Sequence, residues 1–164
     1  MLSVTKMVVT KTLRAASGWL ELGLADEALY ELQALPTEVQ MLRGPLELKL
    51  AAQMERGQWN PASETARLLC LKAEDVPEFF LRAAYCLHEL GQTQEALDLL
   101  ARGPAVLRTK PVYYYNVGCY LACLGENDQA LKLLEQSFEM DGSLRRHARK
   151  DPDLDGLRQK LEKI

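Results

Sequence analysis

The sequence predicts an all-α fold: a right-handed superhelical solenoid of about four helix–turn–helix repeats, closed by a C-terminal helical cap. Glycine recurs at intervals of 34 residues, at Gly23, Gly57, Gly91 and Gly125. Alanine follows each of these glycines by five residues, at Ala28, Ala62, Ala96 and Ala130. Apolar residues flank both positions at helical spacing. A period of 34 residues is typical of arrays in which each repeat is a pair of antiparallel helices.

Each repeat should contain two helices separated by its glycine. Glycine ends the first helix because it adopts the left-handed backbone conformation without steric cost. A small residue stands seven positions earlier in three repeats, at Ala16, Ala84 and Gly118, and should let paired helices approach closely. The spacing predicts helices over residues 4–22, 25–35, 45–56, 60–72, 77–90, 93–103, 111–124 and 127–140.

Proline and polar residues mark the expected helix starts. Prolines should open three first helices, because the first helical position does not need the missing N–H; they are Pro45, Pro77 and Pro111. Polar residues just after the glycines are the expected N-caps of the second helices; they are Asp26, Asn60, Thr93 and Asn127. The second repeat is irregular, since Gln53 stands where the other three have apolar residues.

The predicted organisation is one domain, 1–164, with repeats at about 9–42, 43–76, 77–110 and 111–142 and a cap at 143–164. The cap should hold a short helix from Leu144 to Lys150 and a second from Asp153 to Lys163. Three leucines of the second helix share one face: Leu154, Leu157 and Leu161. This cap is expected to cover the apolar end of the array.

Composition limits the functional classes. A net charge of −3 gives no general attraction to nucleic acid or to anionic membranes. No stretch approaches the ~20 apolar residues of a membrane span, and the start of the chain does not read as a signal peptide. We therefore expect a cytoplasmic protein. Its four cysteines lie in apolar helical patterns and are expected to be free thiols.

Three segments resemble tetratricopeptide repeats: GWLELGLADEAL, AAYCLHELGQTQEALDLL and YNVGCYLACLGENDQALKLLEQSFEMD. The resemblance covers roughly residues 9–142. The chain also resembles a group of small bacterial tetratricopeptide proteins with a DPDLD-type tail, here residues 151–155. The resemblance implies a non-enzymatic module for protein–protein interaction that binds a peptide or protein segment in a concave groove lined by the first helices. The groove positions it implies are Met54, Glu55, Glu78, Leu81, Tyr85, His88, Glu89, Tyr115, Asn116 and Cys119.

The lining of this expected groove is aromatic and apolar, with carboxylates and without lysine or arginine. Such a surface favours a partner segment with apolar anchors and a basic residue. Asn116 occupies a position where family members often hold a peptide backbone through the asparagine amide. A surface asparagine bonded to its helical neighbour is an equally good interpretation of Asn116.

Catalytic and metal-binding patterns give little support to other functions. No phosphate loop, nucleophile elbow or dinucleotide fingerprint is present, so we expect no enzymatic activity and no cofactor. Cys119, Cys123, Cys86 and His88 could supply soft metal ligands from neighbouring helices. Without a CxxC or HxxxH pair, the prediction is that they fill apolar space and that no metal is bound. The basic run at residues 144–150 is expected to be a solvated helix face.

Consecutive tyrosines at 113–115 could suggest a platform for stacking nucleic-acid bases. A helix points three consecutive side chains in different directions, and the groove lacks cations, so no nucleic-acid partner is expected. By its place in the repeat Tyr114 should be a core residue. A secretion-type chaperone or a self-assembling structural protein is the alternative function. A homodimer formed through the N-terminal helix would favour this alternative.

Overall fold

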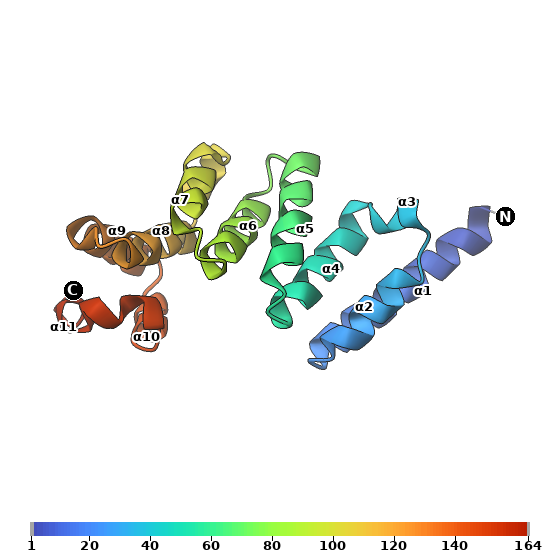
Figure 1. Cartoon of the computed structure of the whole chain (residues 1–164), viewed down its shortest axis with the longest axis horizontal. Helices are drawn as coiled ribbons and strands as arrows, with labels where there is room; N and C mark the ends of the chain where they lie inside the picture. Colours follow the sequence, from blue (N-terminus) through green and yellow to red (C-terminus); the bar gives the residue numbers. More distant parts are fainter. Residues whose placement is uncertain (1, 164) are drawn as a thin grey trace. The chain divides into compact units, whose positions relative to one another are not determined.

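The computed structural model describes residues 2–163, and these residues form helices and turns without any strand (Figure 1). The chain divides into two compact units, residues 1–73 and 74–164. Each unit is described by itself below. The prediction that the four repeats make one domain remains a prediction.

Unit 1 contains two helix pairs and a short linker helix. The first pair is α1 (Leu2–Glu21) and α2 (Ala25–Gln33), and the second is α4 (Arg43–Glu55) and α5 (Trp59–Lys72). The linker helix α3 (Thr37–Gln40) joins the pairs. Small and aliphatic side chains of α1, α2, α4 and the linker after α2 form one buried cluster of this unit. The fully or nearly fully buried members are Ala16, Ala25, Ala28, Leu32, Leu35 and Ala52.

Unit 2 contains two further helix pairs and the C-terminal tail. The pairs are α6 (Pro77–Glu89) with α7 (Thr93–Arg102), and α8 (Pro111–Cys123) with α9 (Asn127–Met140). A 3₁₀ helix, η1 (Ala105–Thr109), links them. The tail forms α10 (Leu144–Ala148), η2 (Pro152–Leu157) and α11 (Arg158–Leu161).

All eight predicted repeat helices are present, with ends within two residues of the expected ones. The prediction missed α3 and η1, which lie in the linkers between repeats. Each of these short helices follows an extended proline, Pro36 or Pro104, and each linker buries a leucine, Leu35 or Leu107. The buried leucine holds each linker against the helices, so the linker forms a short helical turn.

The four periodic glycines have positive φ angles, +71°, +64°, +76° and +84° in chain order. At each glycine the next residue's N–H donates to the carbonyl five positions earlier, as Leu24 does to Trp19 at 2.8 Å and Glu126 to Leu121 at 2.9 Å. This is the Schellman arrangement, which satisfies carbonyls at a helix end. The predicted role of the glycines is therefore confirmed.

The predicted N-caps are wrong. The second helices start earlier, with N-caps Leu24, Gln58, Gln92 and Glu126, none of which makes a side-chain cap bond. The glycine turn already points the carbonyl of the following residue along the new helix. That carbonyl accepts a hydrogen bond from the N–H of the repeated alanine, as Leu24 does from Ala28 at 3.2 Å. Asp26, Asn60, Thr93 and Asn127 therefore lie inside the first turn. Asp26 instead pairs with Arg56.

The proline prediction holds at two of three sites. Pro77 and Pro111 are first residues of α6 and α8. Pro45 is the third residue of α4, because that helix begins at Arg43 with Leu42 as an extended N-cap. The N–H groups of the first turn have no partner within the helix, so proline costs little at this position as well.

Close helix packing follows the small residues of the repeat. The repeated alanines are completely buried. Gly118 of α8 faces α9 so closely that a Cβ there would lie 2.8 Å from Leu134 Cγ. The irregular second repeat has its own solution. Gln53 is buried, and its side-chain oxygen accepts a hydrogen bond of 2.8 Å from the Thr65 hydroxyl on α5.

Candidate functional site

One face of unit 2 is formed by the first helices of its two pairs. On α8, Tyr115, Cys119 and Cys123 are spaced by four residues and therefore share a side of the helix. On α6, Tyr85 and His88 lie three residues apart. We call these five residues the inner face. Four of them belong to the predicted groove: Tyr85, His88, Tyr115 and Cys119.

The tail folds back onto the inner face through Asp151. The Tyr115 hydroxyl donates a hydrogen bond of 2.6 Å to Asp151 Oδ2, and the Cys119 thiol lies 3.7 Å from the same oxygen. The other carboxylate oxygen accepts from the Asp153 N–H at 3.1 Å and caps η2. One carboxylate thus fixes both the tail turn and its position on α8.

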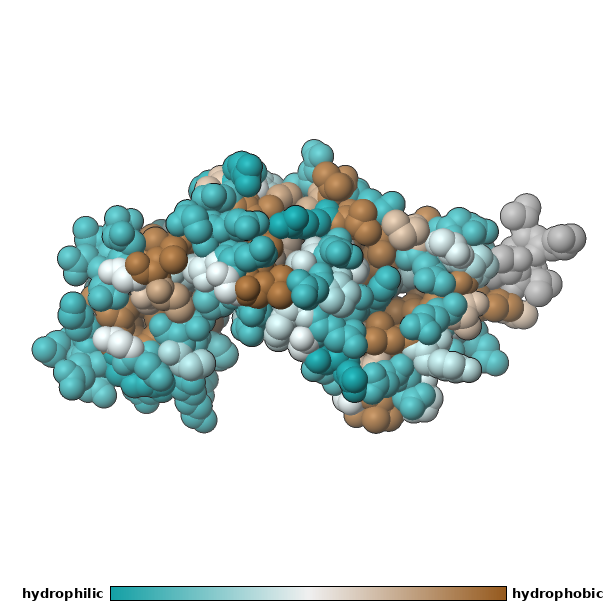
Figure 2. Space-filling model, in the orientation of Figure 1, coloured by the Kyte–Doolittle hydropathy of each residue, from teal (hydrophilic) through white to brown (hydrophobic). Residues whose placement is uncertain are grey.

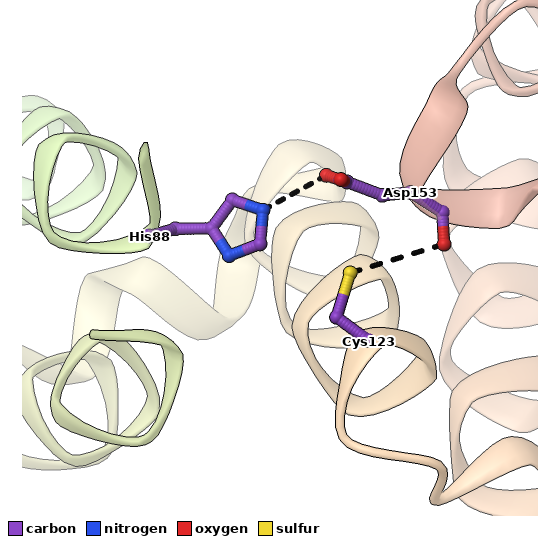
Figure 3. Close-up of side chains that lie close together, drawn as sticks. All are labelled: His88, Cys123 and Asp153. Atoms are coloured by element: carbon purple, nitrogen blue, oxygen red, sulfur yellow. Dashed lines mark hydrogen bonds and ion pairs between the residues drawn. The ribbon is translucent and has the colours of Figure 1, made fainter. Parts of the chain in front are cut away.

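Asp153 makes the second attachment. Its Oδ2 lies 3.0 Å from His88 Nε2 on α6, and its backbone carbonyl accepts a weak bond of 3.9 Å from Cys123 Sγ on α8 (Figure 3). His88 is held from behind, since Nδ1 lies 2.9 Å from Thr93 Oγ1. The imidazole also stacks on Tyr120, with 4.6 Å between ring centroids.

Apolar packing completes the attachment of the tail. Leu154 and Ala148 belong to the same buried cluster as Tyr115, Leu134 and Phe138, and Leu161 packs against that cluster. Leu157 is also buried. The expected cap is therefore present. The structure adds that the tail covers the inner face as well as the end of α8 and α9.

Burial keeps the inner-face thiols and phenols neutral. Burial raises the pKa of the Cys119 thiol, and the negative charges of Asp151 and Asp153 raise it further. Burial also raises the Tyr115 pKa, reinforced by its hydrogen bond to Asp151. On α6, burial and a hydrogen bond to Glu89 raise the pKa of Tyr85 to about 12. This face presents hydrogen-bond donors at neutral pH, without a thiolate of lowered pKa.

An open cavity of about 850 Å³ lies beside the attached tail. Tyr85 and Glu89 of α6 form one side, and both were predicted groove residues. The tail contributes the remaining lining: Ser143, Arg146, His147, Arg149, Lys150, Asp151, Pro152 and Asp153. The basic run therefore adds cations to a surface that the sequence analysis expected to be acidic and apolar.

The ten predicted groove residues have different surroundings. His88, Tyr115 and Cys119 are covered by the tail, while Tyr85 and Glu89 line the open cavity. In unit 2, Leu81 is half-buried against the core cluster, Asn116 is half-buried, and Glu78 pairs with Lys110 at 3.1 Å. In unit 1, Met54 is half-buried and Glu55 is exposed. Their assignment to a binding groove remains a prediction.

Tyr114 is not the core tyrosine that its place in the repeat predicted. It is half-buried, and its hydroxyl donates to the Arg108 carbonyl at 3.0 Å. Tyr115 and Tyr120 are the buried tyrosines, at 4% and 1% exposure. The tail covers Tyr115, which a bare repeat would leave in the groove.

Sequence reasoning missed Asp151 and Asp153 as partners of the inner face. The DPDLD segment contributes to the sequence resemblance, but nothing in it indicates a contact with the repeat helices. Its two aspartates follow the last repeat helix, and no local pattern specifies which repeat a returning tail contacts. All four cysteines are free thiols, as expected.

The fold has a counterpart among solved structures. The chain superimposes on the crystal structure of MamA protein with a TM-score of 0.76, at 19% sequence identity, over 95% of this chain and 87% of that chain. No protein-family model matches the sequence. No curated protein matches it either. The chain is a helical repeat protein with an all-α, tetratricopeptide-like solenoid fold.

The surface in the view of Figure 2 is mostly hydrophilic, with scattered apolar side chains. Within residues 2–163, no helix has the length and apolar character that crossing a lipid bilayer requires.

Proposed function

We propose that this protein is a non-enzymatic module for protein–protein interaction, and that the inner face and its adjoining cavity bind a peptide segment of the partner. The observation that carries the proposal is the mode of tail attachment. Side chains of α6 and α8 hold the segment Asp151–Asp153 through two carboxylates and one backbone carbonyl. A surface that holds a chain segment in this way has the donors that peptide recognition needs.

The open cavity is the part of this surface left for a partner. Tyr85 is 38% exposed there and offers an aromatic contact next to the carboxylate of Glu89. Arg146, Arg149 and Lys150 line the same cavity. A segment with an apolar anchor and charged groups of both signs complements this lining. The sequence predicted a basic residue in the partner, and the basic residues of the tail add a preference for acidic groups.

A displayed peptide library selected against the full chain tests the proposal. The double variant Tyr85→Ala/Glu89→Lys should weaken the selected peptides at least about tenfold, because an aromatic anchor is worth more than 1.4 kcal/mol. The matched control is Tyr30→Ala/Glu27→Lys on α2, where Tyr30 is 74% exposed. Affinity in that control should stay within about twofold of the parent. If both variants lose the same amount of peptide affinity, or neither loses any, Tyr85 and Glu89 do not form the peptide-binding site.

One observation favours the alternative of self-assembly. Helix α1 has 20 residues while its partner α2 has nine, and its N-terminal half exposes Met7 and Val8 at 67% and 53%. Light scattering of the parent chain and of Met7→Lys/Val8→Lys separates the two functions. A dimer that this variant dissociates supports assembly through α1, whereas a monomeric parent argues against it.

A further inference from the structure

Three potential metal ligands converge where the tail meets the inner face. They are His88 on α6, Cys123 on α8 and Asp153 on η2 (Figure 3). Their ligand atoms all lie within 4.8 Å of one another. The three side chains come from separate elements and point toward a common space. All three residues belong to unit 2.

The donor set selects the class of metal. One imidazole nitrogen, one carboxylate oxygen and one cysteine sulfur form a mixed set that suits Zn²⁺, which accepts each of these ligands. The Cys123 thiol would release its proton to solvent when it binds the metal. In a tetrahedral zinc site the ligand atoms stand about 3.3–3.6 Å apart, so the widest separation here must close by roughly an ångström. Cys123 is exposed, and rotation about its Cα–Cβ bond can supply most of that movement.

The histidine is already oriented for coordination. Thr93 Oγ1 lies 2.9 Å from Nδ1, where it can accept the Nδ1–H of the neutral imidazole. That tautomer leaves the Nε2 lone pair facing Asp153 Oδ2 at 3.0 Å. Two lone pairs at this distance need a cation or a proton between them. Stacking on Tyr120 fixes the ring plane, so Thr93 and Tyr120 act as the supporting shell of the ligand.

A second feature shows that hydrogen bonding around this cluster is incomplete. The Tyr120 hydroxyl is buried and has no hydrogen-bond partner among the described residues. Burial raises the pKa of Tyr120, and the negative charge of Asp153 raises it further, which places this phenol in the same electrostatic neighbourhood. Buried polar groups normally find a partner, so the Tyr120 hydroxyl is a candidate partner for a metal-bound water.

We propose that His88, Cys123 and Asp153 bind one Zn²⁺ ion, with water in the fourth position, and that the ion clamps the C-terminal tail to both repeats of unit 2. The proposal goes beyond peptide binding, and it is independent of any partner. The sequence predicted no bound metal, because its cysteines and histidine lack a recognised metal-binding spacing. The structure adds the carboxylate of Asp153 as a third ligand beside His88 and Cys123. Metal binding should stabilise the attached tail, since the unfolded chain lacks the assembled ligands.

The test is Zn²⁺ titration of the metal-free full chain against a chromogenic chelator, with Co²⁺ as a spectroscopic probe. One ion should bind per chain, and the Co²⁺ form should show a thiolate-to-metal charge-transfer band. His88→Gln, Cys123→Ser and Asp153→Asn should each weaken Zn²⁺ at least about tenfold. The charge-transfer band should disappear in Cys123→Ser. Matched controls are His147→Gln and Asp155→Asn, an exposed histidine and aspartate outside the cluster.

Two further measurements keep the outcome decisive. Far-UV circular dichroism checks that each variant folds, and Cys123→Ser changes only an exposed side chain. Hydrogen exchange of residues 151–157 should slow when Zn²⁺ is added to the parent chain but not to Asp153→Asn. Three results would each overturn the proposal: a parent chain that takes no Zn²⁺ from the chelator, ligand variants that bind Zn²⁺ as tightly as the parent, or a charge-transfer band lost in Cys119→Ser but kept in Cys123→Ser.

Discussion

Tyr115 on α8 and Asp151 in the tail are joined by a hydrogen bond of 2.6 Å between Oη and Oδ2. The tyrosine is 4% exposed, and its position in the repeat is one that the sequence assigned to a binding groove. This contact helps to bury a residue that the sequence predicted to lie in an open groove. It also fixes where the tail turns into η2, because the same aspartate caps that helix.

Removing the Tyr115 hydroxyl should destabilise unit 2. In Tyr115→Phe, Asp151 Oδ2 loses the hydroxyl that donates to it. Hydrogen bonds to charged groups stabilise the folded state by about 1.5–3 kcal/mol. We expect a loss of that size in the free energy of unfolding, measured with urea. Tyr113→Phe is the matched control, since the Tyr113 ring packs edge-to-face with Tyr114 and has the Arg108 guanidinium over it, and both contacts survive loss of the hydroxyl. If the control loses as much as Tyr115→Phe, the hydrogen bond is not the cause.

Stability should fall at alkaline pH for a related reason. Burial and Asp151 raise the Tyr115 pKa above its ordinary value of 10.0. The unfolded chain therefore releases the phenol proton first, and it binds fewer protons than the folded chain above about pH 10. The free energy of unfolding then decreases as pH rises through that range, and the stabilisation is complete below it.

The urea midpoint measured at several pH values from about 9 to 11 checks this sign. Tyr115→Phe should show a shallower decline than the parent chain. The decline should not vanish, because burial raises the pKa of Tyr120 and Tyr85 as well. A steeper decline in Tyr115→Phe would contradict the assignment.

Two glycines of α4 and its turn should respond to alanine in opposite directions. Gly57 has φ +64°, so Gly57→Ala places a Cβ in the left-handed region and should cost about 1–2 kcal/mol. Gly44 lies inside α4, and a Cβ there meets no atom within 4 Å. Gly44→Ala should therefore stabilise by up to about 1 kcal/mol, because alanine has less freedom to lose on folding. Thermal unfolding of both variants measures the difference.

Gly118 tests the contact between α8 and α9. In Gly118→Ala the new Cβ would meet Leu134 Cγ at 2.8 Å and the Ala130 carbonyl at 3.3 Å. Overpacking of this kind typically costs about 1–3 kcal/mol, which urea unfolding should reveal. Gly142→Ala is the control, since its Cβ would lie 3.9 Å from the nearest atom. Similar stability of the two variants would mean that the helices separate without cost.

Much of the fold could be predicted because its signals are local. The positive φ of each glycine, the helix on either side and the buried alanine five residues later follow from steric rules within about ten consecutive residues. The N-caps were misplaced because a glycine turn aligns the next carbonyl without help from a polar side chain. The linker turns were missed because their stability comes from single buried leucines, Leu35 and Leu107.

The candidate site depended on contacts that no local pattern contains. Asp151 and Asp153 lie more than 25 residues beyond their partners on α8, and Asp153 lies 65 residues beyond His88. Sequence identifies such residues as polar and titratable, but it does not specify the side chain they will face. By sequence Cys123 is a small apolar filler, but the structure places the imidazole of His88 on α6 and the carboxylate of Asp153 in the tail beside it.

The sequence by itself therefore determined the repeat, its helices and the turn at each glycine, because backbone sterics and helical periodicity act over short distances. Only the tertiary structure decided which of the predicted groove positions are open. The tail buries Tyr115 and Cys119 and leaves Tyr85 and Glu89 at a cavity, because Leu154 and Ala148 pack into the core and carry Asp151 and Asp153 with them. The free energy of that packing is shared among residues distant in the chain, and it exists only once the helices have assembled.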